Sequence, residues 1–197
     1  LIIIYFNTMR ILHNIKIPMS SDKEIKRVKH KNIKQTHHGN KVWDSSMTMI
    51  DFLSRYNLYP IDDAIEIGCG WGVVLSYLEQ NYVNAVGIDI DESTGDFAEV
   101  VEELNGEELN ILYGDYTQMP KEGWQAADLV VACDMCYWEE HIENLVKVID
   151  QCKGTILIAD AGRETFWELT NMVDGNLHEI KLNKPKKVHG YVYEIIK

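Results

Sequence analysis

The sequence contains few of the residues that mark secreted or fibrous proteins. Only four of its 197 residues are cysteine and four are proline, which excludes a disulfide-rich secreted scaffold and a collagen-like chain. No apolar run approaches the roughly 18 residues that a membrane-spanning helix requires. The apolar opening, residues 1–6, is too short for a signal-peptide core and follows no basic residue. We therefore expect a reduced, cytoplasmic protein without a membrane partner.

Charge is distributed unevenly along the chain. The formal net charge is −12, yet residues 1–41 carry nine Lys or Arg against two Asp or Glu, and residues 42–197 carry ten against twenty-nine. We expect residues 1–41 to be a partly disordered basic arm that is solvated, packs on its own domain or meets an acidic partner. An acidic body repels phosphate backbones, so a nucleic acid is not the expected partner. Because the chain begins with Leu1, we expect a fragment or an over-extended reading frame, with Met9 or Met19 as candidate starts.

From Val42 onward the hydrophobic pattern alternates between strands and helices, which predicts one α/β domain over residues 42–197. The expected strands are 64–67, 84–89, 109–113, 127–133, 155–159, 177–182 and 190–196. The expected helices are 44–56, capped by Asp44, and 73–80, 92–104, 139–152 and 164–172. This alternation predicts a mostly parallel sheet covered by helices on both faces. The last two strands have no helix between them, so we expect a hairpin whose final strand runs antiparallel.

A glycine-rich segment follows the first expected strand. Glu66, Gly68, Gly70 and Gly72 are spaced E-x-G-x-G-x-G, and such glycines let the backbone approach a ligand at the N-terminus of the next helix. The dinucleotide-binding fingerprint G-x-G-x-x-G would need glycine at position 73, which is Val73. This argues against a nicotinamide or flavin dinucleotide as the ligand. No Lys-Ser/Thr pair follows the glycines, so the segment is not a phosphate-binding P-loop. The segment therefore indicates a ligand-binding turn of a different kind.

Over about residues 42–197 the chain resembles the class I S-adenosylmethionine-dependent methyltransferases, because four motifs occur in that family's order. After the glycine-rich segment come Asp89 at the end of the second strand, Gly114-Asp115-Tyr116 after the third and Asp134 after the fourth. The resemblance implies a Rossmann-like, seven-stranded, mostly parallel sheet with an antiparallel last strand and helices on both faces. It also implies methyl transfer with S-adenosylmethionine as cofactor.

The same resemblance implies which residues hold the cofactor. Asp89 would accept hydrogen bonds from the ribose hydroxyls, and Asp115 would face the adenine amino group, although aspartate is also common in such turns. Glu66 would hold the methionine ammonium directly or through water, since a carboxylate in a buried strand is costly unless it is paired. The expected cofactor-binding residues are Glu66, Gly68, Cys69, Gly70, Gly72, Asp89, Asp115 and Tyr116.

The fourth strand ends in the D-x-x-Y sequence from Asp134 to Tyr137. This resembles the signature of a group of protein lysine methyltransferases named for that motif, and residues 41–46 resemble the V-W-x-(S/A) start of their first helix. Residues 160–163 resemble the D-P-G-R stretch of the branch that modifies the electron-transfer flavoprotein β-subunit, with Ala161 in place of proline. The resemblance implies that the methyl acceptor is a protein lysine.

Direct in-line displacement by the acceptor nitrogen would need only positioning and charge stabilisation from the enzyme. Asp134 and Tyr137 are the expected catalytic residues, with Asp134 orienting the amine and stabilising the positive charge that grows on it. Trp43 and Trp138 are the expected substrate-binding residues and would line a narrow channel, although large aromatic residues are about as often part of a core.

Alternatives remain at this point. D-x-x-Y is also a degenerate form of the (D/N)-P-P-(Y/F) motif of enzymes that methylate amino groups of bases, glutamine or small amines, with Met135 and Cys136 in place of the prolines. A small-molecule N-methyltransferase and a non-catalytic S-adenosylmethionine-binding protein are therefore kept as alternatives. Cys133 and Cys136 are spaced like metal ligands, but no second pair or nearby histidine matches them, so we expect no metal site.

Overall fold

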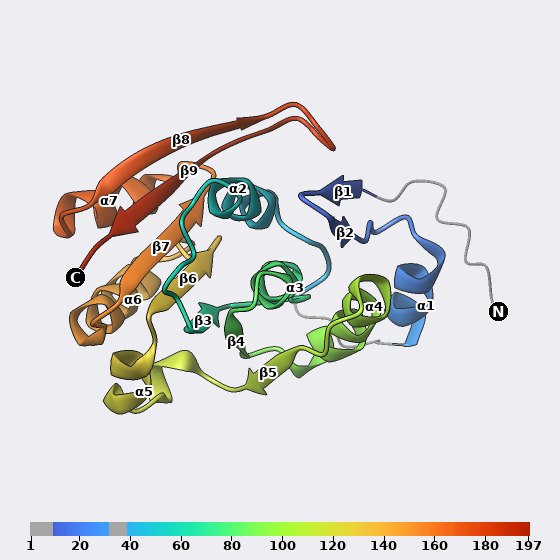
Figure 1. Cartoon of the computed structure of the whole chain (residues 1–197), viewed down its shortest axis with the longest axis horizontal. Coiled ribbons are helices and arrows are strands. Elements are labelled where there is room, and N and C mark those ends of the chain that lie inside the picture. The colour runs from blue at the N-terminus through green and yellow to red at the C-terminus, as the bar shows by residue number, and fades with distance from the viewer. Residues whose placement is uncertain (1–9, 32–38) are drawn as a thin grey trace.

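The computed structural model describes residues 10–31 and 39–197. In this part of the chain, seven strands form one sheet in the order β5-β4-β3-β6-β7-β9-β8 (Figure 1). The strands are β3 (Asp63–Ile67), β4 (Asn84–Asp89), β5 (Asn110–Tyr113), β6 (Leu129–Cys133), β7 (Thr155–Asp160), β8 (Asn176–Leu182) and β9 (Val188–Ile195). Strands β3 to β7 pair in parallel, and β9 runs antiparallel to both of its neighbours. The predicted sheet is confirmed.

Helices cover both faces of this sheet (Figure 1). One face carries α2 (Asp44–Leu53), α3 (Val73–Gln80) and α4 (Gly95–Asn105), and the other carries α5 (Lys121–Ala126), α6 (Glu139–Gln151) and α7 (Glu164–Met172). In β6, Leu129 and Val131 belong to the first core, whereas Val130 and Ala132 belong to the second. A central parallel strand is buried on both faces, which explains its unbroken apolar sequence.

Several local features differ from the sequence prediction. Helix α5 was not predicted, and α2 ends at Leu53 and not at residue 56. The helix expected over residues 92–104 begins as a 3₁₀ turn, η1 (Glu92–Thr94), before α4 starts at Gly95. Asp44 does not cap α2, because Trp43 occupies the N-cap position without a side-chain bond and Asp44 instead pairs with Lys186 at 2.7 Å. The ammonium of Lys186 comes from the loop between β8 and β9, so a long-range ion pair replaces the expected local cap.

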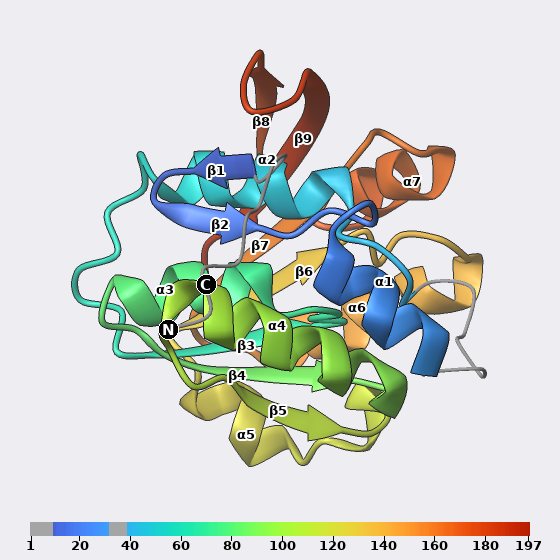
Figure 2. The ribbon, with the colours of Figure 1, turned by 90° about the vertical axis from the view of Figure 1, so that its right-hand side faces the viewer.

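The N-terminal segment folds onto the domain. Strands β1 (Arg10–Leu12) and β2 (Ile15–Ile17) form a hairpin whose turn residues, His13 and Asn14, have φ values of 46° and 70°. Two successive positive φ values are typical of a type I′ hairpin turn. Helix α1 (Lys23–Lys31) follows and lies beside α4 (Figure 2).

Five apolar side chains of this segment are buried in the same core as α2, α3 and α4. They are Leu12, Ile15, Ile17, Ile25 and Val28. Much of the expected basic arm is therefore packed structure, and its remaining parts, residues 1–9 and 32–38, lie outside the described residues. The domain boundary at residue 41 stays a prediction.

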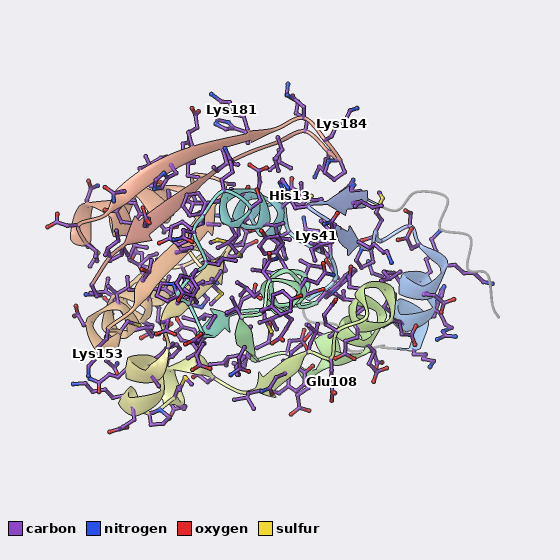
Figure 3. The ribbon with its side chains drawn as sticks, viewed as in Figure 1. His13, Lys41, Glu108, Lys153, Lys181 and Lys184 are labelled. Carbon is purple, nitrogen blue, oxygen red and sulfur yellow. The ribbon has the colours of Figure 1, made fainter. Side chains whose placement is uncertain are left out.

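The final hairpin carries lysines into solvent at one edge of the sheet. Figure 3 shows Lys181 on β8 and Lys184 at the hairpin tip, and the side chain of Lys181 is 66% exposed.

Across residues 10–31 and 39–197, none of the helices combines the length and the apolar character that crossing a membrane demands.

Candidate active site

A cavity of about 420 Å³ opens where strands β3 to β6 end. The chain fills the sheet from β3 outward to β5 and then returns to add β6 on the other side of β3. Open α/β sheets bind ligands in the crevice at such a reversal, and the volume suits a small molecule. Nine predicted site residues line the cavity: Trp43, Gly68, Gly70, Asp89, Asp115, Tyr116, Asp134, Tyr137 and Trp138.

The glycine-rich turn between β3 and α3 forms the floor of this cavity. Gly68, Gly70 and Gly72 have φ values of 66°, 55° and 74°, in the left-handed region that glycine adopts without strain. A Cβ atom at Gly72 would lie 2.6 Å from Leu109 Cδ1, whereas a Cβ atom at Gly70 would meet nothing within 4 Å. Gly72 therefore permits close packing against the sheet, and Gly70 leaves open space for a ligand.

Asp89 joins the end of β4 to the glycine-rich turn. Its Oδ2 accepts a hydrogen bond from Gly70 N at 2.7 Å, and its Oδ1 accepts one from Asp91 N at 2.9 Å. Burial raises the pKa of this carboxyl, and the two backbone hydrogen bonds partly oppose the rise. A carboxylate offers about four acceptor sites, so Asp89 keeps acceptor capacity for hydroxyl groups in the cavity.

Three predicted cofactor residues lie outside the cavity wall: Glu66, Cys69 and Gly72. Glu66 is 1% exposed, and its Oε2 has no hydrogen-bond partner among the described residues. Burial raises its pKa well above the ordinary value. Cys69 is buried against Gly87 of β4, and burial likewise raises the pKa of its thiol. The structure thus assigns Cys69 and Gly72 to packing, while Glu66 is a buried carboxyl behind the loop.

Asp115 serves a turn and also lines the cavity. It is the N-cap of η2 (Tyr116–Gln118), where Oδ1 accepts hydrogen bonds from Thr117 N at 2.9 Å and from Thr117 Oγ1 at 2.8 Å. The neighbouring Tyr116 is half-buried, and burial raises the pKa of its phenol to about 12. The position of Asp115 therefore fits both interpretations from the sequence, that of a turn residue and that of a residue facing the adenine.

Asp134 occupies a constrained position at the end of β6. Its φ value is 57°, which is unusual for a residue other than glycine, and its backbone N–H donates to Ala159 O at 2.9 Å. The side chain is buried, with Oδ1 at 2.5 Å from Arg163 Nη2, while Oδ2 accepts a hydrogen bond from Ser45 Oγ. The carboxylate is therefore fixed by two other elements, the first turn of α2 and the start of α7.

Aromatic side chains line the cavity together with Asp134. The rings of Trp43 and Tyr137 meet edge to face, with centroids 5.8 Å apart, and Lys41 Nζ lies 3.8 Å from the centroid of the Trp43 ring. Trp138 is 61% exposed, so it stands at the cavity rim. Trp43 and Tyr137 thus form a wall, while Trp138 belongs to the mouth.

Sequence reasoning missed several cavity residues. Glu140, His141 and Asn144 line the cavity from the first turns of α6, and Asn144 follows Glu140 by four positions and His141 by three, which places them on one helix face. That spacing is the signal that could have identified them. Gly39 also lines the cavity, and its carbonyl accepts a hydrogen bond from Trp71 Nε1 at 2.8 Å; no local pattern marks this contact.

Among residues 10–31 and 39–197, no three His, Cys, Asp or Glu side chains gather in an arrangement that could hold a metal ion. Cys133 and Cys136 are both buried free thiols, and burial raises the pKa of each. Raised thiol pKa values disfavour the thiolate form that metals bind.

Comparison with known proteins gives two findings. Residues 65–156 match the family model of a methyltransferase domain, which includes the glycine-rich turn, Asp89, Asp115 and Asp134. A search of curated protein sequences gave no match.

Solved structures share the fold at low sequence identity. Magnesium protoporphyrin IX methyltransferase from Synechocystis PCC 6803, crystallised with bound S-adenosylmethionine, is 13% identical, with 90% of this chain and 93% of that chain covered and a TM-score of 0.61. A protein from Pyrococcus horikoshii is 14% identical, with 85% and 98% covered and a TM-score of 0.60. The Pyrococcus abyssi tRNA (uracil-54, C5)-methyltransferase, in complex with S-adenosyl-L-homocysteine, is 15% identical over 77% of this chain, with a TM-score of 0.57; the chain spans 38% of that enzyme.

These structural similarities establish the fold, and the domain match covers the strands that build the cavity. The predicted fold and cofactor are confirmed at this level, while the lysine-modifying branch is not. Together, the domain match over residues 65–156 and the fold support an S-adenosylmethionine-dependent methyltransferase.

Proposed function

We propose that the enzyme transfers a methyl group to an amine nitrogen, and that this amine is the side chain of a protein lysine. The observation that carries the proposal is the position of Asp134, a buried carboxylate that lines the same cavity as the aromatic side chains of Trp43 and Tyr137. A carboxylate and π-faces both favour a nitrogen that carries or gains positive charge. The structural relatives include a tRNA uracil methyltransferase and a magnesium protoporphyrin IX methyltransferase, so the fold alone does not decide the acceptor.

The cavity fits the cofactor by its shape and its hydrogen-bonding groups. Gly70 leaves space above the turn, Asp89 has acceptor capacity for the ribose hydroxyls, and Asp115 and Tyr116 border the region expected to receive adenine. Glu66 brings a buried carboxyl with an unpartnered oxygen behind the turn, which suits a contact through water to the methionine ammonium. When bound, S-adenosylmethionine supplies an electrophilic methyl group on a sulfonium sulfur.

The residues of the chain then need to prepare the nucleophile. A lysine amine has an ordinary pKa of about 10.4, so removing its proton at pH 7 costs about 4.6 kcal/mol. Asp134 orients the amine through an acceptor site that Ser45 and Arg163 leave unused, and it stabilises the charge that develops on nitrogen as the methyl group arrives. Trp43 and Tyr137 exclude water from the reacting atoms. The proton leaves through water before attack.

A small amine is the second candidate acceptor. It is favoured by the N-terminal segment, because Gly39, Lys41 and Trp43 all line the cavity and Trp71 anchors Gly39 there. A wall of this kind narrows the entrance and would suit a free small molecule. If the acceptor is small, Lys41→Ala should lower transfer, because it changes this wall and leaves the buried N-terminal hairpin intact.

As part of the same proposal, residues 42–197 form the catalytic domain and the enzyme acts in the cytoplasm. Its four cysteines are all free and buried, as expected for a reducing compartment.

The test is transfer from methyl-labelled S-adenosylmethionine into a cell lysate that is then separated into protein, nucleic-acid and small-molecule fractions. We expect label on lysine in one protein band. The Asp134→Ala variant should lose this label, and its cofactor dissociation constant should stay within about threefold of wild type, because Asp134 contacts the acceptor. Label only among small molecules would replace lysine with the second candidate, and normal transfer by Asp134→Ala would remove Asp134 from the acceptor site.

A further inference from the structure

An arginine stands directly behind the proposed acceptor site. Arg163 is the N-cap residue of α7, and its guanidinium bridges two buried carboxylates, Asp134 Oδ1 at 2.5 Å and Asp160 Oδ2 at 2.5 Å. Arg163 and Asp160 do not line the cavity, whereas Asp134 and Tyr137 do. Any effect of the arginine on the cavity is therefore transmitted through these two wall residues.

The arginine is held on several sides. Asp160 Oδ1 accepts hydrogen bonds from Gly162 N at 2.8 Å and from Arg163 N at 2.9 Å, so the same carboxylate fixes both the backbone and the side chain of Arg163. The guanidinium carbon lies 4.1 Å from the centroid of the Tyr137 ring. Its planar fork can reach two carboxylates and stack on an aromatic ring at once, which a lysine ammonium cannot do.

We propose that Arg163 is a positioning residue that fixes the orientation of Asp134 and Tyr137 toward the acceptor; this rests on the proposed function. Asp134 needs such support because its backbone lies in the left-handed region, with a φ value of 57°. A residue other than glycine keeps this strained conformation only when contacts with its surroundings fix it. Ser45 holds one carboxylate oxygen and Arg163 the other. The carboxylate of Asp134 therefore has one fixed orientation toward the acceptor.

Charge balance supports the same role. Asp134 and Asp160 share one guanidinium, so this buried group carries one net negative charge instead of two. Burial lowers the pKa of Arg163, but the two carboxylates outweigh this effect and hold it above its ordinary value. The acceptor amine is thus offered one negative charge, which orients it without holding its ammonium form as strongly as two would.

Loss of Arg163 has a definite consequence for pH dependence. Burial raises the pKa of Asp160, and the hydrogen bonds and charge of Arg163 oppose that rise while the charge of Asp134 adds to it. The other titratable groups that face this pair are Tyr137 and the thiols of Cys133 and Cys136. Without the guanidinium, the pKa of Asp160 rises further, so Asp160 takes up a proton at a higher pH.

The experiment compares wild type with Arg163→Ala and Arg163→Lys on whichever acceptor the labelling identifies. Arg163→Ala should lower kcat roughly 100-fold, the scale of a misplaced catalytic group, with cofactor affinity within threefold of wild type. The acidic limb of the pH profile should move to higher pH, and added guanidinium ion should restore part of the lost rate. The matched control is Arg55→Ala, which removes an exposed arginine paired with Asp51 on α2 and should leave kcat unchanged.

Each outcome decides the question. Wild-type kcat and an unmoved pH profile in Arg163→Ala would overturn the positioning role, and so would a loss that guanidinium does not restore and that abolishes cofactor binding. If Arg163→Ala fails to fold, Arg163→Lys carries the comparison, because it keeps the charge without the bridge; full activity there overturns the proposal. The labelling experiment tests the proposed function separately. If the labelled atom is not an amine nitrogen, the proposed function fails, whatever the Arg163 variants show.

Discussion

Asp89 accepts a hydrogen bond from the backbone N–H of Gly70 at 2.7 Å, across 19 positions of sequence. This bond ties the end of β4 to the turn that follows β3, so the two elements expected to hold opposite parts of the cofactor are fixed to each other. A ligand that bridges them therefore meets a preorganised site, and its affinity should depend on both residues.

Asp89→Ala should weaken cofactor binding at least tenfold. A hydrogen bond to a charged group contributes about 1.5–3 kcal/mol, and about 1.4 kcal/mol corresponds to a tenfold change in affinity. Calorimetric titration with S-adenosylmethionine measures the effect. Asp150→Ala, which removes an exposed aspartate from α6, is the control and should bind as wild type does. Equal affinities for the two variants would remove Asp89 from the cofactor site.

Two glycines of the same turn should respond differently to alanine. Both have positive φ values, so each substitution costs about 1–2 kcal/mol of backbone strain. At Gly72 the added methyl group also lies 2.6 Å from Leu109 Cδ1, whereas at Gly70 it enters open space in the cavity. Gly72→Ala should therefore lose more stability in urea unfolding, and Gly70→Ala should stay the more stable of the two yet lose more cofactor affinity. The reverse order would show that the ligand does not approach Gly70.

Sequence patterns predicted the parts of the molecule that depend on local signals. The apolar runs of β6 and β7 and the glycine spacing after β3 each fall within a few residues, so these strands and the ligand-binding turn between β3 and α3 could be predicted. The partners of Asp134 could not, because Ser45 lies 89 residues away in the chain and Arg163, which follows β7, meets Asp134 only once β7 has paired with β6. The sequence identified residues 160–163 as a resemblance but gave them no physical role.

The N-terminal hairpin was missed for a related reason. Each strand has three residues, and the turn uses His13 and Asn14 in place of the Asn-Gly pair that usually marks a type I′ turn. The basic charge of this region indicated a solvated arm, while the apolar residues that bury it are too few to form a periodic pattern.

Residues 10–31 should contribute to global stability, because Ile15 is fully buried and Ile11, on the same hairpin, is 55% exposed. Truncating a buried isoleucine to alanine typically costs about 2–5 kcal/mol, and an exposed one costs about 0.5 kcal/mol or less. Ile15→Ala should therefore lower the urea midpoint clearly, and Ile11→Ala should not. Equal midpoints would mean that the hairpin is detached from the cooperative unit.

Glu66 should make the stability of the ligand-free enzyme fall as pH rises. Burial raises its folded-state pKa well above the ordinary 4.5, so between 4.5 and that higher value the folded chain keeps a proton that the unfolded chain has lost. Its contribution to stability is complete below the unfolded-state pKa and is lost as pH rises through the folded-state pKa.

Urea unfolding of wild type and Glu66→Gln across neutral pH tests this sign. The free energy of unfolding of wild type should fall relative to the glutamine variant as pH increases, because glutamine cannot lose a proton and stays uncharged in the buried site. Glu143→Gln, at an exposed position of α6, should follow wild type throughout. If the wild-type and Glu66→Gln curves run parallel, Glu66 does not change its protonation on folding, and its role behind the glycine-rich turn would have to be that of a permanently charged group.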